Sequence, residues 1–297
     1  MKRSILLFML SYLLVGLNGI SQNYHPVVLK SAHVRTIKSD IVKGMEYELC
    51  VALPPGYEET TITYPVVYML DAYEIFGLQL QTYQQLVFFE TVHPLILVGI
   101  NYNFEGKPFY EGLKDYLYIR SRDFTPTYLS QEKIIEKHGK GFADLVPVSG
   151  GGEKFFRFIR EELFPFIESE YRADPNDRGI FGYSLGGLFS TYALFNDPAS
   201  FQKYFIGSAF LAWDDQAVFN FYKESKFNAL KNPLKVYISV GELEGKRMKD
   251  SWQKLKGFLE EKQPHILLQT EILNGESHLS GIGLAHSRAF RRLYSKK

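Results

Sequence analysis

The chain has 297 residues, of which 45% are hydrophobic and 23% are charged, as in an ordinary folded globular protein. Its 34 Lys and Arg residues nearly balance its 33 Asp and Glu residues, so the net charge of +1 gives no electrostatic reason to expect nucleic acid as a partner. The single cysteine, Cys50, excludes an intrachain disulfide framework and a thiolate metal cluster.

The first 21 residues have the pattern of a secretory signal peptide. Lys2 and Arg3 precede a mostly apolar run at 5–17, and the small residues Gly19 and Ser21 follow it. The run is shorter than the roughly 20 apolar residues that a membrane-spanning helix needs, so stable membrane insertion is not expected. We therefore expect a bacterial protein that is secreted or periplasmic, with a mature chain of residues 22–297.

The rest of the chain alternates between strand-like and helix-like segments. The expected strands lie at 27–37, 46–53, 66–70, 95–101, 178–182, 204–208, 234–240 and 266–272. The expected helices lie at 78–92, 153–171, 185–196, 249–262 and 284–294. The runs at 66–70 and 95–100 are continuously apolar, as buried parallel strands are. This alternation predicts an α/β domain with a mostly parallel central sheet of about eight strands and helices on both faces.

Two segments depart from this regular alternation. Pro165 lies inside the amphipathic helix expected at 153–171 and should bend or divide it. The stretch 103–152 is the least regular part of the chain and is rich in aromatic residues. Because long insertions between core elements often cover a site, we expect 103–152 to form a lid or a substrate wall.

The residues Gly182-Tyr183-Ser184-Leu185-Gly186 match the G-x-S-x-G pattern of a nucleophile elbow. They stand between an expected strand and an expected helix, which is the context that the motif requires. A tight turn there lifts the Ser184 hydroxyl to the carboxyl edge of the sheet and leaves the Leu185 amide free to stabilise an oxyanion. The pattern predicts Ser184 as a catalytic nucleophile.

A serine nucleophile needs a histidine base, which in this class of hydrolase follows both the serine and the acid in the chain. His278 lies in a turn directly after the last expected strand. His265 lies at the start of that strand, which is the wrong edge, and His286 lies inside the final helix. The other histidines precede Ser184. We therefore predict His278 as the base.

The residues leave the acid open between Glu242 and Glu244, which both follow the strand expected at 234–240. Asp214 and Asp215 are less well placed. A second oxyanion donor should come from the loop after the strand at 66–70, as the backbone amide of Ala72 or Tyr73. Asp71 in this loop is expected to brace it.

Other motifs do not point to a cofactor. Gly150-Gly151-Gly152-Glu153-Lys154 precedes a helix but lacks the spacing of a phosphate-binding loop, and Ser200-x-x-Lys203 lacks its partner motifs. We find no H-E-x-x-H pattern or other paired metal-ligand spacing. We therefore expect neither a metal nor a nucleotide cofactor.

Several stretches resemble the esterase D family of α/β hydrolases, and most closely its exported members that cleave trilactone siderophores. They are 64–71, 97–100, 120–126, 151–171 and 182–188, and the likeness runs in matching order over about 40–290. The resemblance implies the α/β-hydrolase fold and favours Glu244 over Glu242. It also places Arg120 and Arg122 beside the cleft, where either could contact an acidic or catecholate substrate or form a structural salt bridge.

Tyr183, beside the nucleophile, is also expected to bind the substrate. The same resemblance implies that Trp213 belongs to the substrate site, although relatives often have two tryptophans where this chain has one. The combined expectation is an exported serine carboxylesterase that forms an acyl-enzyme. Its substrate would be a small-molecule or carbohydrate ester, such as a siderophore trilactone or an acyl or feruloyl polysaccharide. An acyltransferase and a non-catalytic binding protein on the same fold are the alternatives.

Overall fold

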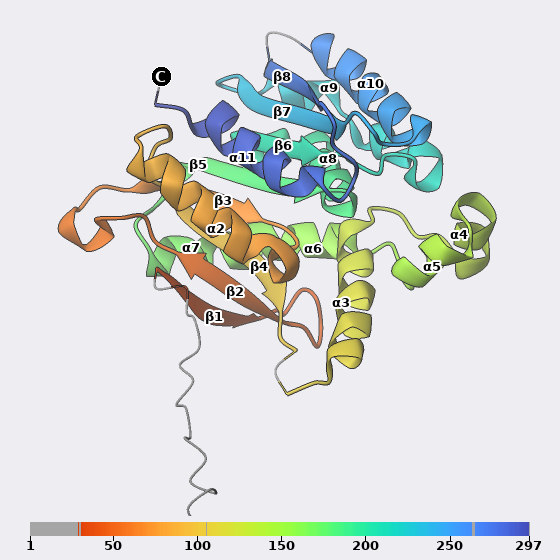
Figure 1. Cartoon of the computed structure of the whole chain (residues 1–297), viewed down its shortest axis with the longest axis horizontal. Coiled ribbons are helices and arrows are strands. Elements are labelled where there is room, and N and C mark those ends of the chain that lie inside the picture. The colour runs from red at the N-terminus through yellow and green to blue at the C-terminus, as the bar shows by residue number, and fades with distance from the viewer. Residues whose placement is uncertain (1–28, 30, 105, 263–264, 297) are drawn as a thin grey trace, which may run out of the picture. The chain divides into compact units, whose positions relative to one another are not determined.

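The computed structural model describes residues 29, 31–104, 106–262 and 265–296 (Figure 1). The signal peptide expected at 1–21 lies outside the described residues. The compact unit begins at Ser31 and runs to the end of the chain.

The described chain is built on one eight-stranded sheet, in the order β1-β2-β4-β3-β5-β6-β7-β8. The strands are β1 (Ala32–Lys38), β2 (Glu46–Ala52), β3 (Tyr64–Met69), β4 (Ile96–Tyr102), β5 (Ala173–Tyr183), β6 (Lys203–Gly207), β7 (Leu234–Gly241) and β8 (Ile266–Leu273). The pairs β1–β2 and β2–β4 are antiparallel, and all the others are parallel. The predicted mostly parallel sheet is confirmed.

Helices cover both faces of this sheet (Figure 1). The longer ones are α2 (Ala72–Phe88), α3 (Phe109–Phe124), α8 (Leu185–Asn196), α10 (Lys246–Glu260) and α11 (Gly281–Tyr294). The shorter ones are α4 (Gln131–His138), α5 (Lys140–Leu145), α6 (Gly152–Phe158), α7 (Phe164–Glu170) and α9 (Glu224–Asn228), with 3-10 turns η1 (Tyr57–Glu59), η3 (Pro198–Ser200) and η4 (Trp213–Phe221).

The sheet separates two apolar cores. One core packs α2 and α11 on one face of the strands, and the other packs α6, α7, α8 and α10 on the opposite face. Alternate residues of a strand point to opposite faces, so the central strands must be apolar at every position to serve both cores. Strand β4, from Ile96 to Tyr102, is buried along its whole length.

The predicted break at Pro165 is confirmed, and the structure shows its form. A π-helical turn, η2 (Ile159–Leu163), separates α6 from α7, and the Phe164 N–H donates to the Ile159 carbonyl. Proline has no N–H to donate and clashes with the carbonyl four residues earlier in a regular helix. The wider turn before Pro165 removes this conflict.

Two sequence expectations were wrong in detail. The helix expected from 78 begins at Ala72, directly after β3 and Asp71. The stretch 103–152 is not irregular, because it contains α3, α4 and α5. Helices α4 and α5 are only 8 and 6 residues long, too short for an apolar period to identify them. Among the described residues, no helix combines the length and the apolar character needed to cross a membrane.

Candidate active site

Ser184 lies between β5 and α8 in a backbone conformation that is unusual for serine, with φ of 58° and ψ of −116°. Its neighbours must be small for this turn to form. A Cβ on Gly182 would lie 2.1 Å from the Gly186 carbonyl oxygen, and one on Gly187 would lie 2.8 Å from the Gly207 carbonyl oxygen. The glycines therefore let the chain turn sharply between the strand and the helix, as a nucleophile elbow requires.

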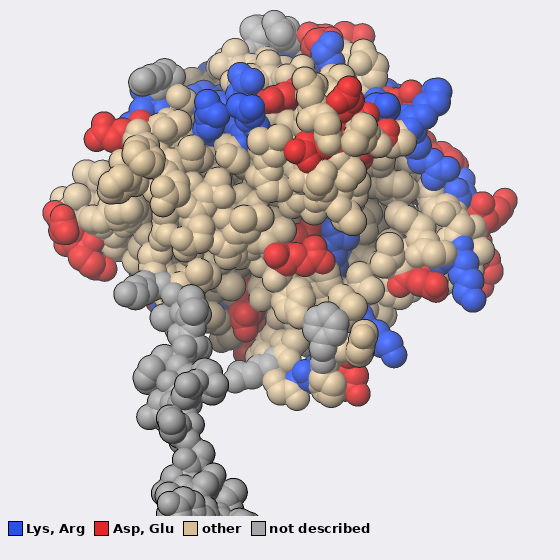
Figure 2. Space-filling view, viewed as in Figure 1, with Lys and Arg blue, Asp and Glu red and all other residues tan. Residues whose placement is uncertain are grey.

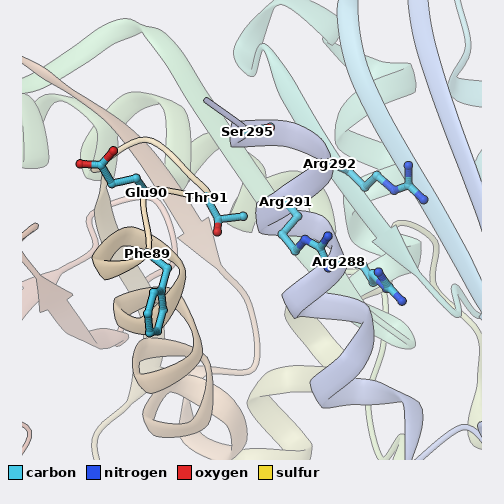
Figure 3. A pocket seen from close by; sticks show the side chains of 7 residues that line it. All are labelled: Phe89, Glu90, Thr91, Arg288, Arg291, Arg292 and Ser295. Carbon is cyan, nitrogen blue, oxygen red and sulfur yellow. The ribbon is translucent and has the colours of Figure 1, made fainter. Parts of the chain in front are cut away.

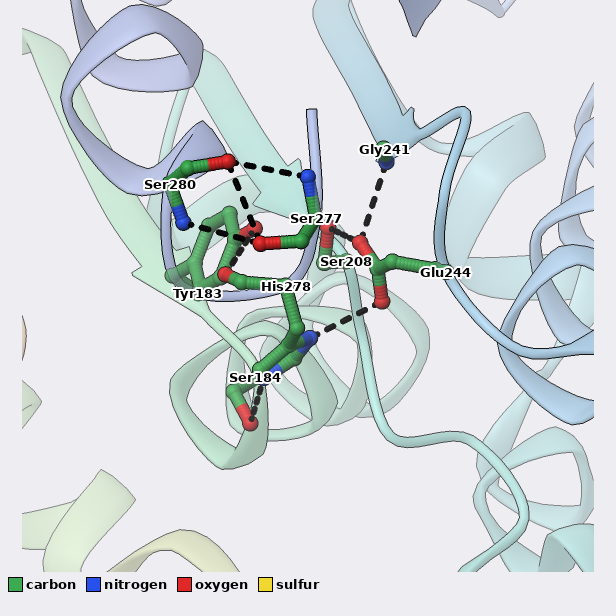
Figure 4. Close-up of polar contacts among 8 residues, drawn as sticks. All are labelled: Tyr183, Ser184, Ser208, Gly241, Glu244, Ser277, His278 and Ser280. Atoms are coloured by element: carbon green, nitrogen blue, oxygen red, sulfur yellow. Dashed lines mark hydrogen bonds and ion pairs between the residues drawn. The ribbon is translucent and has the colours of Figure 1, made fainter. Parts of the chain in front are cut away.

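Three of the predicted residues form one hydrogen-bonded chain (Figure 4). Ser184 Oγ lies 3.0 Å from His278 Nε2, and His278 Nδ1 lies 2.8 Å from Glu244 Oε2. His278 comes from the loop between β8 and α11, and Glu244 from the loop between β7 and α10. If Nδ1–H donates to the carboxylate, Nε2 is left as an acceptor for the serine proton.

The Glu244 carboxylate is buried and held at both oxygens. Oε1 accepts hydrogen bonds from the Ser208 hydroxyl at 2.5 Å and from the Gly241 N–H at 3.0 Å. Burial alone would raise the pKa of Glu244, but the hydrogen bonds from His278, Ser208 and Gly241 outweigh it and hold this pKa below its usual value. Glu244 is therefore held as a carboxylate. Ser208 was not foreseen from the sequence.

Glu242 points elsewhere. Its carboxylate accepts a hydrogen bond from the Gly275 N–H at 2.7 Å and ties together the loops after β7 and β8. The two candidate acids therefore have different partners, and only Glu244 contacts His278.

The loop that carries His278 is fixed at several points (Figure 4). The Tyr183 hydroxyl donates to the His278 carbonyl oxygen at 2.8 Å. The Ser277 N–H donates to the Ser280 hydroxyl at 2.9 Å, and the Ser280 N–H donates to the Ser277 hydroxyl at 3.3 Å. These bonds restrict the imidazole to the side of Ser184.

The two expected oxyanion donors occupy equivalent places in the fold. Leu185 is the first residue of α8, and Ala72 is the first residue of α2. The first N–H groups of a helix have no acceptor within the helix, and the positive end of the helix dipole lies beside them. The two helices therefore present amide donors of the kind that a developing negative charge requires.

Arg120 and Arg122 have different surroundings. Arg120 pairs with Asp71, with Nε at 2.5 Å from Oδ1 and Nη2 at 2.9 Å from Oδ2. Arg122 instead pairs with the buried Asp123 at 2.7 Å, and its carbonyl oxygen accepts the Gly151 N–H. For Arg122 the structure thus has the salt bridge that was the alternative to a substrate contact.

Trp213 is fully buried, and its indole N–H donates to Thr127. It packs in the larger apolar core and is not among the residues that line the cavity beside Ser184. Trp213 was expected at the substrate site, but the structure places it in the core, where its indole N–H has Thr127 as partner. Tyr183, in contrast, does line this cavity.

A cavity of about 290 Å³ opens at Ser184 and His278. Its wall is formed on one side by α2, the elbow and the start of α11, and on the other by α3 and α5. The apolar part of the lining is Ile75, Leu117, Phe142, Leu145, Val146, Leu185, Leu279 and Ile282. The charged part is Asp71, Glu74 and Arg120. Between α2 and α3, Figure 2 shows acidic atoms at the edge of a recess with basic atoms deeper inside it.

A second concavity, of about 560 Å³, lies at the far end of α11. Arg288, Arg291 and Arg292 project from the last turns of this helix, opposite the loop 89–91 that follows α2 (Figure 3). None of the predicted site residues lines it. Arg288 and Arg292 are both near Glu271, at 3.5 Å and 3.4 Å.

The other two histidines considered from the sequence do not reach Ser184. His265 lies directly before β8, at the opposite edge of the sheet. His286 is fully buried in α11, and its Nδ1–H donates to the Ile282 carbonyl at 2.8 Å. Burial lowers the pKa of His286 to about 4. Within the described ranges, no group of three or more His, Cys, Asp or Glu side chains is arranged to hold a metal ion.

The fold and the hydrogen-bonded Ser-His-Glu chain define the class of α/β hydrolases. Comparison with known proteins narrows the class. The family described as "Putative esterase" matches residues 123–292, and the chain belongs to this family of enzymes that hydrolyse esters. The ferri-bacillibactin esterase BesA of Bacillus subtilis is 36% identical over 77% of this chain and 78% of its own length.

Two further comparisons agree with this assignment. The siderophore enterobactin esterase of Emericella nidulans is 33% identical over 33% of this chain and 32% of its own length. The crystal structure of the BES protein from Bacillus cereus superposes with a TM-score of 0.76 and 27% identity, covering 92% of this chain and 99% of that chain. The predicted α/β-hydrolase fold and the predicted family are thus confirmed.

Proposed function

We propose that this protein is an exported serine esterase that cleaves the ester bonds of a siderophore through an acyl-enzyme. The observation that carries the serine mechanism is the chain of contacts from Ser184 through His278 to Glu244, with distances of 3.0 Å and 2.8 Å. The siderophore substrate is supported by the relatives named for such esters, of which one shares 36% identity over 245 residues.

The proposed reaction has two halves. Ser184 Oγ attacks the ester carbonyl carbon while its proton passes to His278 Nε2, and the Leu185 and Ala72 amides stabilise the oxyanion. The tetrahedral intermediate collapses, and the leaving alcohol takes the proton from His278. Water then attacks the acyl-enzyme with His278 again as base, releasing the carboxylic acid and free Ser184. Glu244 keeps the imidazole oriented and stabilises its protonated form.

Export and the lid belong to the same proposal. Residues 1–21 would direct secretion and be removed, so that the domain of 22–297 works outside the cytoplasm. The segment 103–152 would act as the substrate wall, since Tyr116, Leu117, Arg120, Phe142, Leu145 and Val146 of this segment line the cavity. Tyr183 would contact the substrate from the elbow side.

Hydrolysis by residues 22–297 and by the variant Ser184→Ala tests the mechanism. The panel is p-nitrophenyl acetate, methyl ferulate, acetylated xylan and enterobactin with and without iron. We expect enterobactin turnover to be highest and kcat/KM to fall about 10⁴-fold or more in Ser184→Ala. Labelling of Ser184 by a fluorophosphonate should accompany this activity. Equal rates for both proteins, with no labelling, would contradict the serine mechanism, and capture of the acyl group by an added alcohol would indicate an acyltransferase.

A further inference from the structure

Asp71 occupies an unusual place at the start of α2. It is the N-cap residue, with φ of 57° and ψ of 32°, a left-handed conformation that few residues other than glycine adopt. An aspartate at this position normally folds its carboxylate back onto the first N–H groups of the helix. Here the Asp71 side chain makes no such capping hydrogen bond.

The Asp71 carboxylate is instead held from the side by α3. Arg120 binds both of its oxygens, at 2.5 Å and 2.9 Å, and the Tyr116 hydroxyl donates to Oδ1 at 2.8 Å. The side chains of Arg120 and Asp71 are 15% and 7% exposed. Burial alone would lower the pKa of Arg120, but Asp71 outweighs it and raises this pKa above its usual value, so the guanidinium stays charged. A two-point contact between such groups fixes orientation as well as distance.

This arrangement bears on the proposed oxyanion site. The carboxylate lies against the elbow, since a Cβ on Gly186 would be 3.2 Å from Asp71 Oδ2. A carboxylate that swung back to cap α2 would accept from the N–H of Tyr73 or Glu74, the second and third residues of the helix, and would place a negative charge beside the Ala72 amide, where the oxyanion must form. Keeping the carboxylate away spares the oxyanion this repulsion.

We propose that Arg120 and Tyr116 are positioning residues, which hold the Asp71 carboxylate off the start of α2 and so keep its negative charge away from the place where the Ala72 amide stabilises the oxyanion. The inference rests on the proposed serine mechanism. It gives Arg120 a role in every ester cleavage, whereas an arginine that bound an anionic part of the substrate would matter only for esters that carry such a part.

The smallest substrate, p-nitrophenyl acetate, separates these two roles because its acyl group is a two-carbon unit without charge. We expect Arg120→Gln to lower kcat for this ester about 30-fold, with KM changed less than about threefold. Arg120→Lys should restore part of this loss, because a lysine keeps the charge but not the two-point contact. Tyr116→Phe removes one hydrogen bond and should lower kcat about threefold.

A double-mutant cycle tests whether Arg120 acts through Asp71. In the Asp71→Asn background, Arg120→Gln should lower kcat less than about threefold further, because the contact is already lost. Glu153→Gln, an exposed acidic position at the start of α6, is the control for a general change of charge and should leave kcat unaltered.

Three results would overturn the inference. One is full kcat for p-nitrophenyl acetate in Arg120→Gln, with a raised KM only for anionic esters. Another is an equal loss from Arg120→Gln with and without Asp71→Asn. The third is an unchanged kcat in Tyr116→Phe. This variant replaces Arg120→Gln as the test if Arg120→Gln does not unfold cooperatively and is therefore misfolded. Failure of the proposed function is distinct from these, because Ser184→Ala would then retain the wild-type rate.

Discussion

The two walls of the cavity are built in different ways. The wall with Ser184 and His278 includes the short loops at the carboxyl ends of β5 and β8, and Glu244 in the neighbouring loop after β7 holds His278 in place. Hydrogen bonds fix each of these loops. The opposite wall comes from α3 and α5, with partly exposed apolar side chains such as Leu145, which is 53% exposed. The first wall fits the need of catalysis for fixed geometry, and the second fits the need for a surface that can vary with the substrate.

The sharpest test of the first wall is a matched pair of acid variants. Glu244→Gln should lower kcat about 10³-fold, because the imidazole loses the carboxylate that orients it and stabilises its charge. Glu242→Gln, two residues away, should lower kcat less than about twofold, because Glu242 bonds to the Gly275 N–H and not to His278. Rates on p-nitrophenyl acetate measure both. Similar losses of kcat in the two variants would contradict the assignment of Glu244 as the carboxylate that orients His278.

A second prediction concerns the core beneath this wall. The pKa of His286 is about 4 in the fold because of burial, against 6.5 in the unfolded chain. Between these values the unfolded chain binds a proton that the folded chain does not. The stability that the neutral, buried His286 contributes to the fold is therefore fully present above pH 6.5 and is lost as the pH falls toward 4. From pH 7 to pH 4.5 the free energy of unfolding should fall by roughly 2 to 3 kcal/mol through this group.

Urea unfolding at these two pH values measures the change. The fall in the free energy of unfolding from pH 7 to pH 4.5 should be smaller in His286→Gln than in the wild type, by roughly 2 to 3 kcal/mol, because glutamine cannot titrate. His286→Asn, which also removes the titrating imidazole from α11, is the companion variant and should show the same reduced pH dependence. An unchanged pH dependence in His286→Gln would show that this buried imidazole does not destabilise the fold in acid.

The smallest expected effect belongs to the second wall. Leu145→Ala removes apolar surface from the cavity and should raise KM for enterobactin about fivefold, or about 1 kcal/mol, with a smaller change in kcat. Leu267→Ala is a matched control, because Leu267 is also 53% exposed but lies on β8 away from the cavity. A large fall in kcat in Leu145→Ala would contradict the view that one wall carries the catalytic groups and the other only contacts the substrate.

The features that depend on neighbouring residues could be predicted from the sequence. The alternation of apolar runs and amphipathic helices predicted all eight strands, because the period of each segment follows from which faces it must bury. The elbow was also predictable, because Gly182 and Gly187 are required by contacts with backbone atoms. The order of Ser184, Glu244 and His278 along the chain follows from the order in which the strands deliver their loops to one edge.

The tertiary structure decided what depends on contacts between distant segments. Glu242 and Glu244 are alike as residues of one loop, and only the position of His278, 34 residues after Glu244, separates them. Arg120 and Arg122 lie two residues apart, yet one meets Asp71 across 49 residues and the other its neighbour Asp123. Local patterns record which face of an element is buried, but the partner of a polar side chain is fixed only when the elements pack together, so these assignments required the fold.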